Sequence, residues 1–224
     1  MGVFDREASS YDDWYKTTLG KHVDEVETRC ALNLLQPQNG LKILDVGCGT
    51  GNFSIKLAKM GCIVTGVDIS DRMLQIARNK ASAENLTAKF LTMDICSLEI
   101  EDESFDAVIS MAALEFIEKP LKAIDEMFRV LKHGGHLLAG TINRDSSWGK
   151  LYIKQGQKNG SVFAHANFWT MKELSGLRSK EIVSSAECLF VPPDIEGATI
   201  GERKEQEFAS KGKGGFICIL WEKQ

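Results

Sequence analysis

Three aspartates carry the first chemical signal in this chain, because each stands near the end of a predicted strand. Asp45 lies in the apolar stretch 43–46, and Asp68 and Asp94 come at the ends of the next two β-like stretches. Ligands of open α/β sheets bind at the carboxyl ends of parallel strands. The spacing therefore predicts a ligand site with several carboxylates at one end of a sheet.

A glycine-rich turn follows the first of these strands. Gly47, Gly49 and Gly51 occupy alternate positions between the stretch 43–46 and a helical pattern over 52–60. Glycine permits a tight turn and a close approach of the backbone to a ligand, and the helix start adds free N–H donors and a partial positive charge. The turn lacks the Gly-Lys-Ser/Thr of a P-loop, and its G-x-G-x-G spacing differs from the dinucleotide fingerprint.

The acids beside this turn restrict the kind of ligand. Asp45, two residues before Gly47, would repel a pyrophosphate but suits an ammonium group. Asp68 lies about 17 residues after Gly51, close to the roughly 20-residue spacing at which an acid reaches ribose hydroxyls in such folds. The pattern thus asks for a ligand with a ribose, an ammonium and no phosphate. S-adenosylmethionine meets all three conditions.

The sequence around these residues resembles a known family. Asp-Val-Gly-Cys-Gly-Thr-Gly at 45–51, Gly-Val-Asp-Ile-Ser at 66–70 and Met-Leu at 73–74 are similar to motifs of the class I S-adenosylmethionine-dependent methyltransferases, closest to their small-molecule branch. The resemblance is strongest over 41–141. It implies a Rossmann-like α/β fold with a seven-stranded, mostly parallel sheet, helices on both faces and an antiparallel last strand. It also implies methyl transfer from S-adenosylmethionine to a small-molecule acceptor.

The resemblance assigns roles to individual residues. It places Asp45 near the methionine ammonium, Asp68 on the ribose hydroxyls and Asp94 on the adenine amine, with Ile69 and Met73 against the adenine ring. The whole expected cofactor-binding set is Tyr15, Asp45, Gly47, Cys48, Gly49, Asp68, Ile69, Met73, Asp94, Ile95, Ser110 and Met111.

The first twenty residues contain aromatic side chains at roughly helical spacing, which predicts a small amphipathic helix over 1–20. One interpretation is that the rings pack in the core, where aromatic stripes usually lie. The resemblance implies instead a lid over the cleft. Tyr11 and Tyr15 are then the candidates to face the sulfonium, because aromatic faces attract cations.

No catalytic residue is assigned. The resemblance implies that 110–117 lines the methyl-transfer cleft, and Glu115 is the one titratable group there, either a base or the partner of a cation. His165 is expected to be a surface or capping residue. In-line methyl transfer needs alignment above all, and alignment alone can supply effective molarities of roughly 10⁵–10⁸ M.

The rest of the chain is expected to form one domain, 1–224, with a helical cap (1–40), a cofactor-binding core (41–141) and a substrate-side insert with the final strands (142–224). Acceptor specificity is expected in 1–20, 142–180 and 192–213, although the acceptor itself is not predicted. Loops are predicted at 146–150 and 156–160, a turn at 133–135 and a solvated charge run at 202–207. The expected helices are 20–35, 52–60, 120–131 and segments from 70 and 170, and the expected strands are 43–46, 63–67, 88–92, 105–110, 136–141, 181–191 and 215–221.

Composition excludes several classes of protein. The 224 residues carry a net charge of −4, which gives no electrostatic case for nucleic acid or an anionic membrane. No apolar run is long enough to span a membrane, and charges near the N-terminus argue against a signal peptide. Six cysteines without C-x-x-C spacing favour reduced thiols in the cytoplasm over metal binding.

Two other functions stay open at this stage. One is a non-catalytic S-adenosylmethionine-binding partner subunit, and the other is a nicotinamide-dependent oxidoreductase. A monomer or a homodimer is expected.

Overall fold

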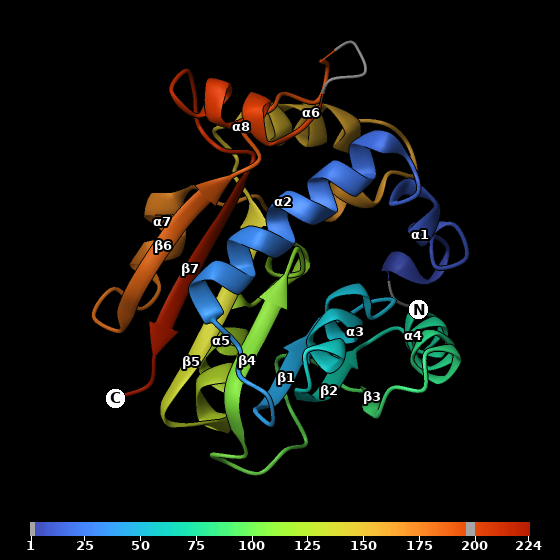
Figure 1. Cartoon of the computed structure of the whole chain (residues 1–224), viewed down its shortest axis with the longest axis vertical. Helices are drawn as coiled ribbons and strands as arrows, with labels where there is room; N and C mark the ends of the chain where they lie inside the picture. The colour runs from blue at the N-terminus through green and yellow to red at the C-terminus, as the bar shows by residue number, and fades with distance from the viewer. Residues whose placement is uncertain (1–2, 196–199) are drawn as a thin grey trace.

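The computed structural model describes residues 3–195 and 200–224, so parts of two segments predicted to confer specificity, at 1–2 and 196–199, lie outside the described residues. Its centre is a seven-stranded sheet of order β3-β2-β1-β4-β5-β7-β6 (Figure 1). The strands are β1 (Lys42–Val46), β2 (Ile63–Asp68), β3 (Ala88–Thr92), β4 (Phe105–Met111), β5 (Leu131–Ile142), β6 (Ile182–Cys188) and β7 (Phe216–Glu222).

The pairing of these strands confirms the predicted fold class. β1 pairs in parallel with both β2 and β4, and β3 and β5 continue the parallel sheet on either side. β7 alone runs antiparallel, between β5 and β6. The first six residues of β7 are buried, which explains its nearly unbroken apolar sequence.

Successive residues of the central strands point to opposite faces of the sheet. Ile43 packs in one core cluster with residues of α2 (Thr18–Leu35) and α3 (Asn52–Lys59). Leu44 and Val46 pack in the other, against α5 (Pro120–Val130) and α7 (Met171–Gly176). Figure 1 shows α2 crossing one face while α5 lies behind the sheet. Asp45 has the same parity as Ile43, so it belongs to the α2 and α3 side.

Helix starts follow from local capping. The Thr17 hydroxyl accepts from Gly20 N–H and begins α2, and Ser70 caps α4 (Asp71–Ala83) through Met73 N–H. Pro120 is the first residue of α5, as predicted. Thr170 and Glu173 form the predicted capping box of α7.

Residues 3–20 do not form one helix. They form a 3₁₀ turn, η1 (Val3–Asp5), and the single-turn helix α1 (Tyr11–Trp14), and α2 already starts at Thr18. The Thr17 hydroxyl donates to Trp14 O at 2.7 Å while it accepts from Gly20, so this residue ends one turn and begins the next helix. Local side-chain bonds therefore override the aromatic periodicity.

Two segments predicted as loop or solvated chain are helices. The predicted loop region contains α6 (Ser147–Gly156), whose N-cap Ser146 accepts from Gly149 and whose Trp148 indole donates to Val191 O at 2.8 Å. The predicted charge run is α8 (Glu202–Ala209), and Glu205 within it is buried. Both helices are fixed by long-range contacts of one buried side chain.

The turn predicted at 133–135 lies inside a strand. β5 begins at Leu131, which pairs with Phe105 before a register shift brings His136 opposite Ala107. Gly134, at φ +72°, lies in this irregular stretch. The segment therefore bends within the strand, as a β-bulge does, without leaving the sheet.

None of the helices in the described part of the chain is both long enough and apolar enough to cross a membrane.

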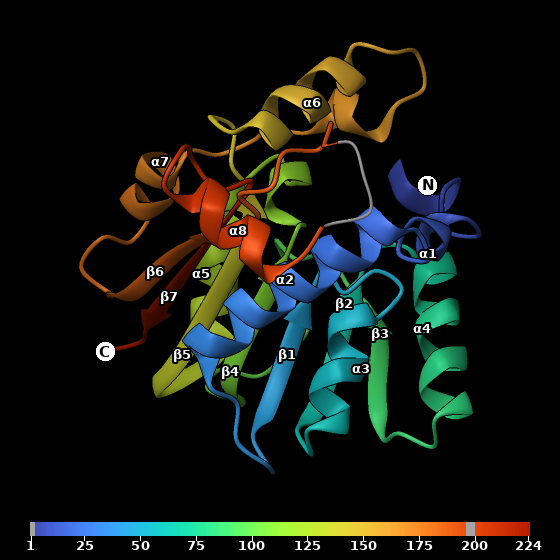
Figure 2. The same ribbon diagram turned by 45° about the horizontal axis from the view of Figure 1, so that its top comes forward.

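Figure 2 shows α6 and the N-terminal segment with α1 on the side of the sheet where β4 ends, so both lie near the carboxyl ends of the parallel strands.

Candidate functional site

A cavity of about 550 Å³ lies at the carboxyl ends of the parallel strands. This volume is within the range of small-molecule and cofactor sites, about 300–1,000 Å³. Its walls come from the segments that follow the four strands β1 to β4, from α2 and from the N-terminal residues. The lining residues that follow these strands include Gly47, Cys48, Gly49, Ile69, Met93, Asp94, Ile95, Cys96, Ala112 and Ala113.

The glycine turn forms one wall of this cavity. Gly47, at φ +73°, and Cys48 both donate their N–H groups to Val67 O, at 2.8 and 3.0 Å, and so fix the turn to β2. Gly49, at φ +53°, lines the cavity, and a Cβ at this position would meet no atom within 4 Å. The missing side chain leaves open space that a ligand can occupy against the backbone.

Asp45 lies beneath this turn with 2% of its surface exposed, and Ser54 Oγ donates to its Oδ2 at 2.5 Å. Burial raises the pKa of Asp45 to about 7, and the nearby Asp68 contributes in the same direction. A positively charged ligand group beside it would favour the ionised form. The position therefore suits an ammonium.

Asp68 is held by two backbone donors. Gly49 N–H donates to its Oδ2 at 2.9 Å, and Ser70 N–H donates to its Oδ1 at 2.8 Å. Burial nevertheless raises the pKa of this carboxyl group. Each oxygen retains a second lone pair, so a fixed carboxylate at the cavity wall can accept further bonds from hydroxyl groups.

An apolar surface continues beyond Asp68. Met73 is buried, whereas Ile69 lines the cavity with 66% of its surface exposed, a large exposed fraction for an isoleucine. Asp94 accepts from Cys96 N–H at 2.8 Å, and Ile95 beside it is buried. A flat ring between Ile69 and this loop would cover apolar surface and meet one carboxylate at its edge.

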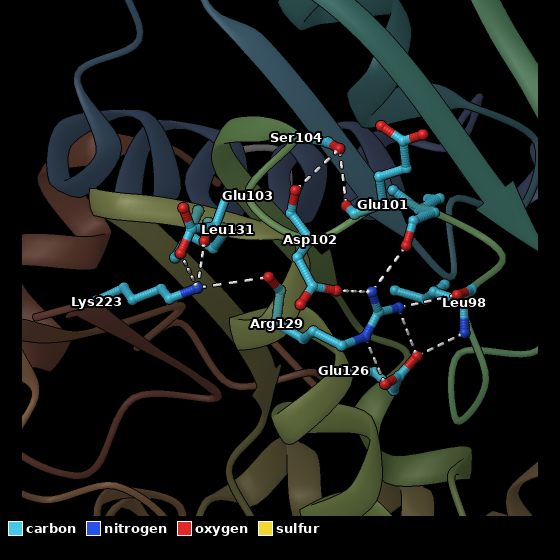
Figure 3. Close-up of polar contacts among 10 residues, drawn as sticks. Leu98, Glu101, Asp102, Glu103, Ser104, Glu126, Arg129, Leu131 and Lys223 are labelled. Carbon is cyan, nitrogen blue, oxygen red and sulfur yellow. Dashed lines mark hydrogen bonds and ion pairs between the residues drawn. The ribbon is translucent and has the colours of Figure 1, made fainter.

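Arg129 of α5 bonds to the segment 98–102, which continues the loop that carries Asp94 to Cys96 (Figure 3). Its guanidinium donates to Leu98 O at 2.9 Å and Ile100 O at 2.7 Å, and it pairs with Glu126 through two bonds of 2.9 Å. Glu126 in turn accepts from Leu98 N–H at 2.8 Å. Sequence reasoning missed this group because Glu126 and Arg129 lie about thirty positions from Leu98 and Ile100, and no local motif links them.

The N-terminal segment is attached to the glycine turn through Asp12. The Asp12 carboxylate accepts from Thr50 Oγ1 at 2.7 Å and from Asn52 Nδ2 at 3.0 Å, and it pairs with Lys80 at 3.0 Å. These bonds attach the segment that carries Tyr11 and Tyr15, and both tyrosines line the cavity. The segment thus forms part of the cavity wall, and its role as a lid stays a prediction.

The wall formed by α2 was not predicted. Asp24, Glu27 and Thr28 of this helix line the cavity, although the sequence pattern indicated only an amphipathic packing helix. Their spacing of one helical turn places them on one side of α2. No sequence signal separates such acids from the solvated charges that amphipathic helices normally carry.

Of the twelve residues predicted to bind the cofactor, Ser110 is the one that does not line the cavity. It is fully buried, and within the described residues its hydroxyl has no hydrogen-bond partner. Glu115 does not line the cavity either. It is 1% exposed, both of its oxygens lack a hydrogen-bond partner in the described part of the chain, and burial raises its pKa to about 7. His165 ends the 3₁₀ segment η3 (Val162–His165) and is exposed.

Comparisons with known proteins agree with this fold. A family model described as a methyltransferase domain matches residues 44–139. An uncharacterized protein of Methanocaldococcus jannaschii is 35% identical over 227 residues, and the alignment covers both chains completely. A solved structure from Thermotoga maritima, described as an S-adenosylmethionine-dependent methyltransferase and possible histamine N-methyltransferase, matches with a TM-score of 0.77 and 27% identity over 99% of this chain and 98% of that one.

A ubiquinone biosynthesis O-methyltransferase of Coxiella burnetii is 40% identical over 106 residues, which cover 47% of this chain and 45% of that protein. The match to this enzyme thus spans about half of its length. Together these findings show that the chain belongs to the class I S-adenosylmethionine-dependent methyltransferases. It is an enzyme whose methyl donor is S-adenosylmethionine, so the nicotinamide-dependent alternative does not hold.

Proposed function

We propose that this enzyme transfers the methyl group of S-adenosylmethionine to a small-molecule acceptor bound in the same cavity. The observation that carries the proposal is the cavity itself, about 550 Å³, with carboxylates near the ends of three neighbouring strands and aromatic residues of the N-terminal segment in its wall. The donor supplies an electrophilic methyl group on a sulfonium.

The residues around the cavity fit this donor. Asp45 receives the methionine ammonium, since a buried carboxyl group gains most from an adjacent cation. Asp68 accepts from the ribose hydroxyls, and Asp94 accepts from the adenine amine. Ile69 and Met73 contact the adenine ring, and Gly47, Cys48 and Gly49 bring the backbone close to the donor.

The lid favours a small acceptor. Asp12 attaches the segment that carries Tyr11 and Tyr15 to the glycine turn, so this part of the cavity wall is in place before any substrate binds. A polypeptide or a nucleic acid would need an open groove, and the net charge of −4 offers no attraction for a polyanion. The names of the quinone O-methyltransferase and of the possible histamine N-methyltransferase also point to small acceptors.

Alignment is the main contribution of the protein to the reaction. The backbone of 47–49, fixed to β2, and the carboxylate of Asp68 define where the donor lies. The rings of Tyr11 and Tyr15 exclude water and stabilise positive charge near the transferred methyl group.

The free state of all six cysteines accords with a reducing, cytoplasmic setting.

The test is calorimetric titration with S-adenosylmethionine and S-adenosylhomocysteine. Asp68→Ala should weaken both affinities at least about tenfold, because it removes a charge-assisted acceptor. Asp71→Ala, which removes an exposed acid three residues later, should leave them within about twofold. Equal effects of the two variants would contradict the assignment of Asp68. Formation of S-adenosylhomocysteine with small amines, phenols and thiols, but not with protein or RNA, would support a small acceptor.

A further inference from the structure

The cavity wall formed by α2 carries two carboxylates, of which one is neutralised. Asp24 pairs with Lys56, whose ammonium also donates to Thr28 Oγ1 at 2.7 Å. Glu27 lines the cavity one turn later, and within residues 3–195 and 200–224 its carboxylate has neither a hydrogen bond nor an ion pair. A half-buried acid without a partner is unfavourable unless a ligand supplies the partner.

Aromatic rings surround the same region. Phe4, Tyr11, Tyr15 and Phe116 all line the cavity. The ring centroids of Phe4 and Phe116 are 4.8 Å apart, and those of Tyr11 and Tyr15 are 5.8 Å apart. Burial raises the pKa of both tyrosines, and the charge of Glu27 contributes to the shift in each. Because Glu27, Tyr11 and Tyr15 all line this one cavity, the carboxyl group and the two rings can act on the same ligand.

Positive charge is located elsewhere along the described cavity wall. Lys119 and Lys122 are the basic residues that line it. Lys119 belongs to the adenine side, because its carbonyl lies 3.8 Å from Cys96 Sγ, next to Asp94. Lys56, whose charge also acts on Glu27, is already paired with Asp24. An anionic acceptor such as a phenolate or carboxylate would thus meet Glu27 without a further cation on this part of the described wall. An ammonium group would meet a carboxylate and several ring faces.

We propose that the acceptor is a small amine with an apolar or aromatic body, and that Glu27 binds its ammonium group and then takes its proton. This proposal rests on the methyl-transfer function proposed above and names the acceptor class for the same cavity. Glu27 is then a catalytic residue, since it touches the reacting nitrogen.

The step balances in atoms and charge. The ammonium group gives one proton to the Glu27 carboxylate and becomes a neutral amine. The nitrogen lone pair forms the N–C bond to the methyl group while the C–S bond breaks, and its electron pair stays on sulfur as a neutral thioether. The product leaves as a methylammonium ion, and the Glu27 carboxyl group returns its proton to water. General-base catalysis of this kind contributes about 10²–10⁴-fold.

A competing assignment is that Glu27 binds the ammonium of the methyl donor itself. The two roles have different consequences. If Glu27 binds the acceptor, its replacement changes the selection between amines and neutral analogues and leaves donor affinity intact. If it binds the donor, its replacement lowers the affinity for S-adenosylhomocysteine, which carries the same ammonium group.

The experiment uses the full chain saturated with S-adenosylhomocysteine and titrated with 2-phenylethylamine and with 2-phenylethanol, which replaces the amine by a hydroxyl. Wild type should bind the amine at least about tenfold more tightly than the alcohol, because a charge-assisted bond is lost in the alcohol. Glu27→Gln should remove this preference, and Glu27→Asp should retain part of it. Glu25→Gln, on the exposed side of α2, is the matched control and should keep the full preference.

Each other outcome is decisive. Equal binding of the two probes to wild type, or no binding of either, overturns the amine proposal. A preference that persists in Glu27→Gln overturns the role of Glu27, as does a tenfold loss of S-adenosylhomocysteine affinity in that variant. With S-adenosylmethionine present, absence of N-methylation despite amine binding overturns the proton transfer. Failure of wild type to bind S-adenosylhomocysteine at all would instead contradict the proposed function.

Discussion

Glu115→Gln should change how the stability of the ligand-free protein depends on pH. Glu115 is 1% exposed, and burial raises the pKa of its carboxyl group from an ordinary 4.5 to about 7. The folded state thus holds a proton that the unfolded state has released between these two values. Stability from this group is fully present below pH 4.5 and is lost as the pH rises through 7.

The pKa shift of Glu115 sets the size of the expected effect. A difference of about 2.5 pKa units, at about 1.36 kcal/mol per unit, corresponds to about 3 kcal/mol of folding stability lost by pH 8.5. Glutamine keeps the size and polarity of the side chain but does not ionise. The change in unfolding free energy on Glu115→Gln should therefore be more favourable at pH 8.5 than at pH 4.5, by about 3 kcal/mol.

Urea denaturation at pH 4.5, 6 and 8.5, followed by tryptophan fluorescence, measures this difference. The buried Asp45, whose pKa is also raised to about 7, contributes a slope of the same sign to both proteins, so it cancels in the comparison. Glu118→Gln, an exposed position in the same segment, controls for loss of a glutamate. A pH-independent effect of Glu115→Gln would refute the reasoning, because it would mean that the carboxyl group titrates alike in the folded and unfolded states.

Three further predictions concern side chains that make long-range polar contacts. Asp12→Ala should weaken S-adenosylhomocysteine binding about five- to thirtyfold by calorimetry, because hydrogen bonds to Thr50 and Asn52 and the ion pair with Lys80 are lost. Asp13→Ala, which removes an exposed ion pair, should not weaken it, and equal affinities of the two variants would disprove the role of the N-terminal segment. Arg129→Lys should lower the free energy of unfolding in urea by about 1–3 kcal/mol, because lysine lacks the planar guanidinium that bonds Glu126 and two carbonyl groups. An unchanged urea midpoint would show that the loop does not depend on Arg129. Glu205→Gln should lower the free energy of unfolding in urea by about 2 kcal/mol, because Glu205 accepts from two backbone N–H groups and contacts His22 at 3.0 Å. The control is Glu202→Gln at an exposed position of the same helix. An equal loss of stability in both variants would contradict the role of Glu205.

Local patterns in the sequence determined the core of the fold. The apolar stretches and capping residues predicted β1 to β4, α2 to α5 and the capping box at Thr170, because each depends on neighbours within a few positions. The glycine turn and the strand-ending aspartates likewise predicted where a ligand would bind. Their chemistry is local, and parallel strands necessarily bring their carboxyl ends together.

Tertiary structure decided what depends on distant partners. Glu205 belongs to a run that looks solvated, but His22 and the backbone of 190–191 bury it. Arg129 looks like an ordinary helix-end cation, yet it bonds to the loop after β3, whose carbonyl groups at Leu98 and Ile100 lie about thirty residues earlier. Glu27 looks like a surface charge on an amphipathic helix. It lines the cavity because α2 packs across the sheet beside the N-terminal segment, and its sequence neighbours do not encode that packing.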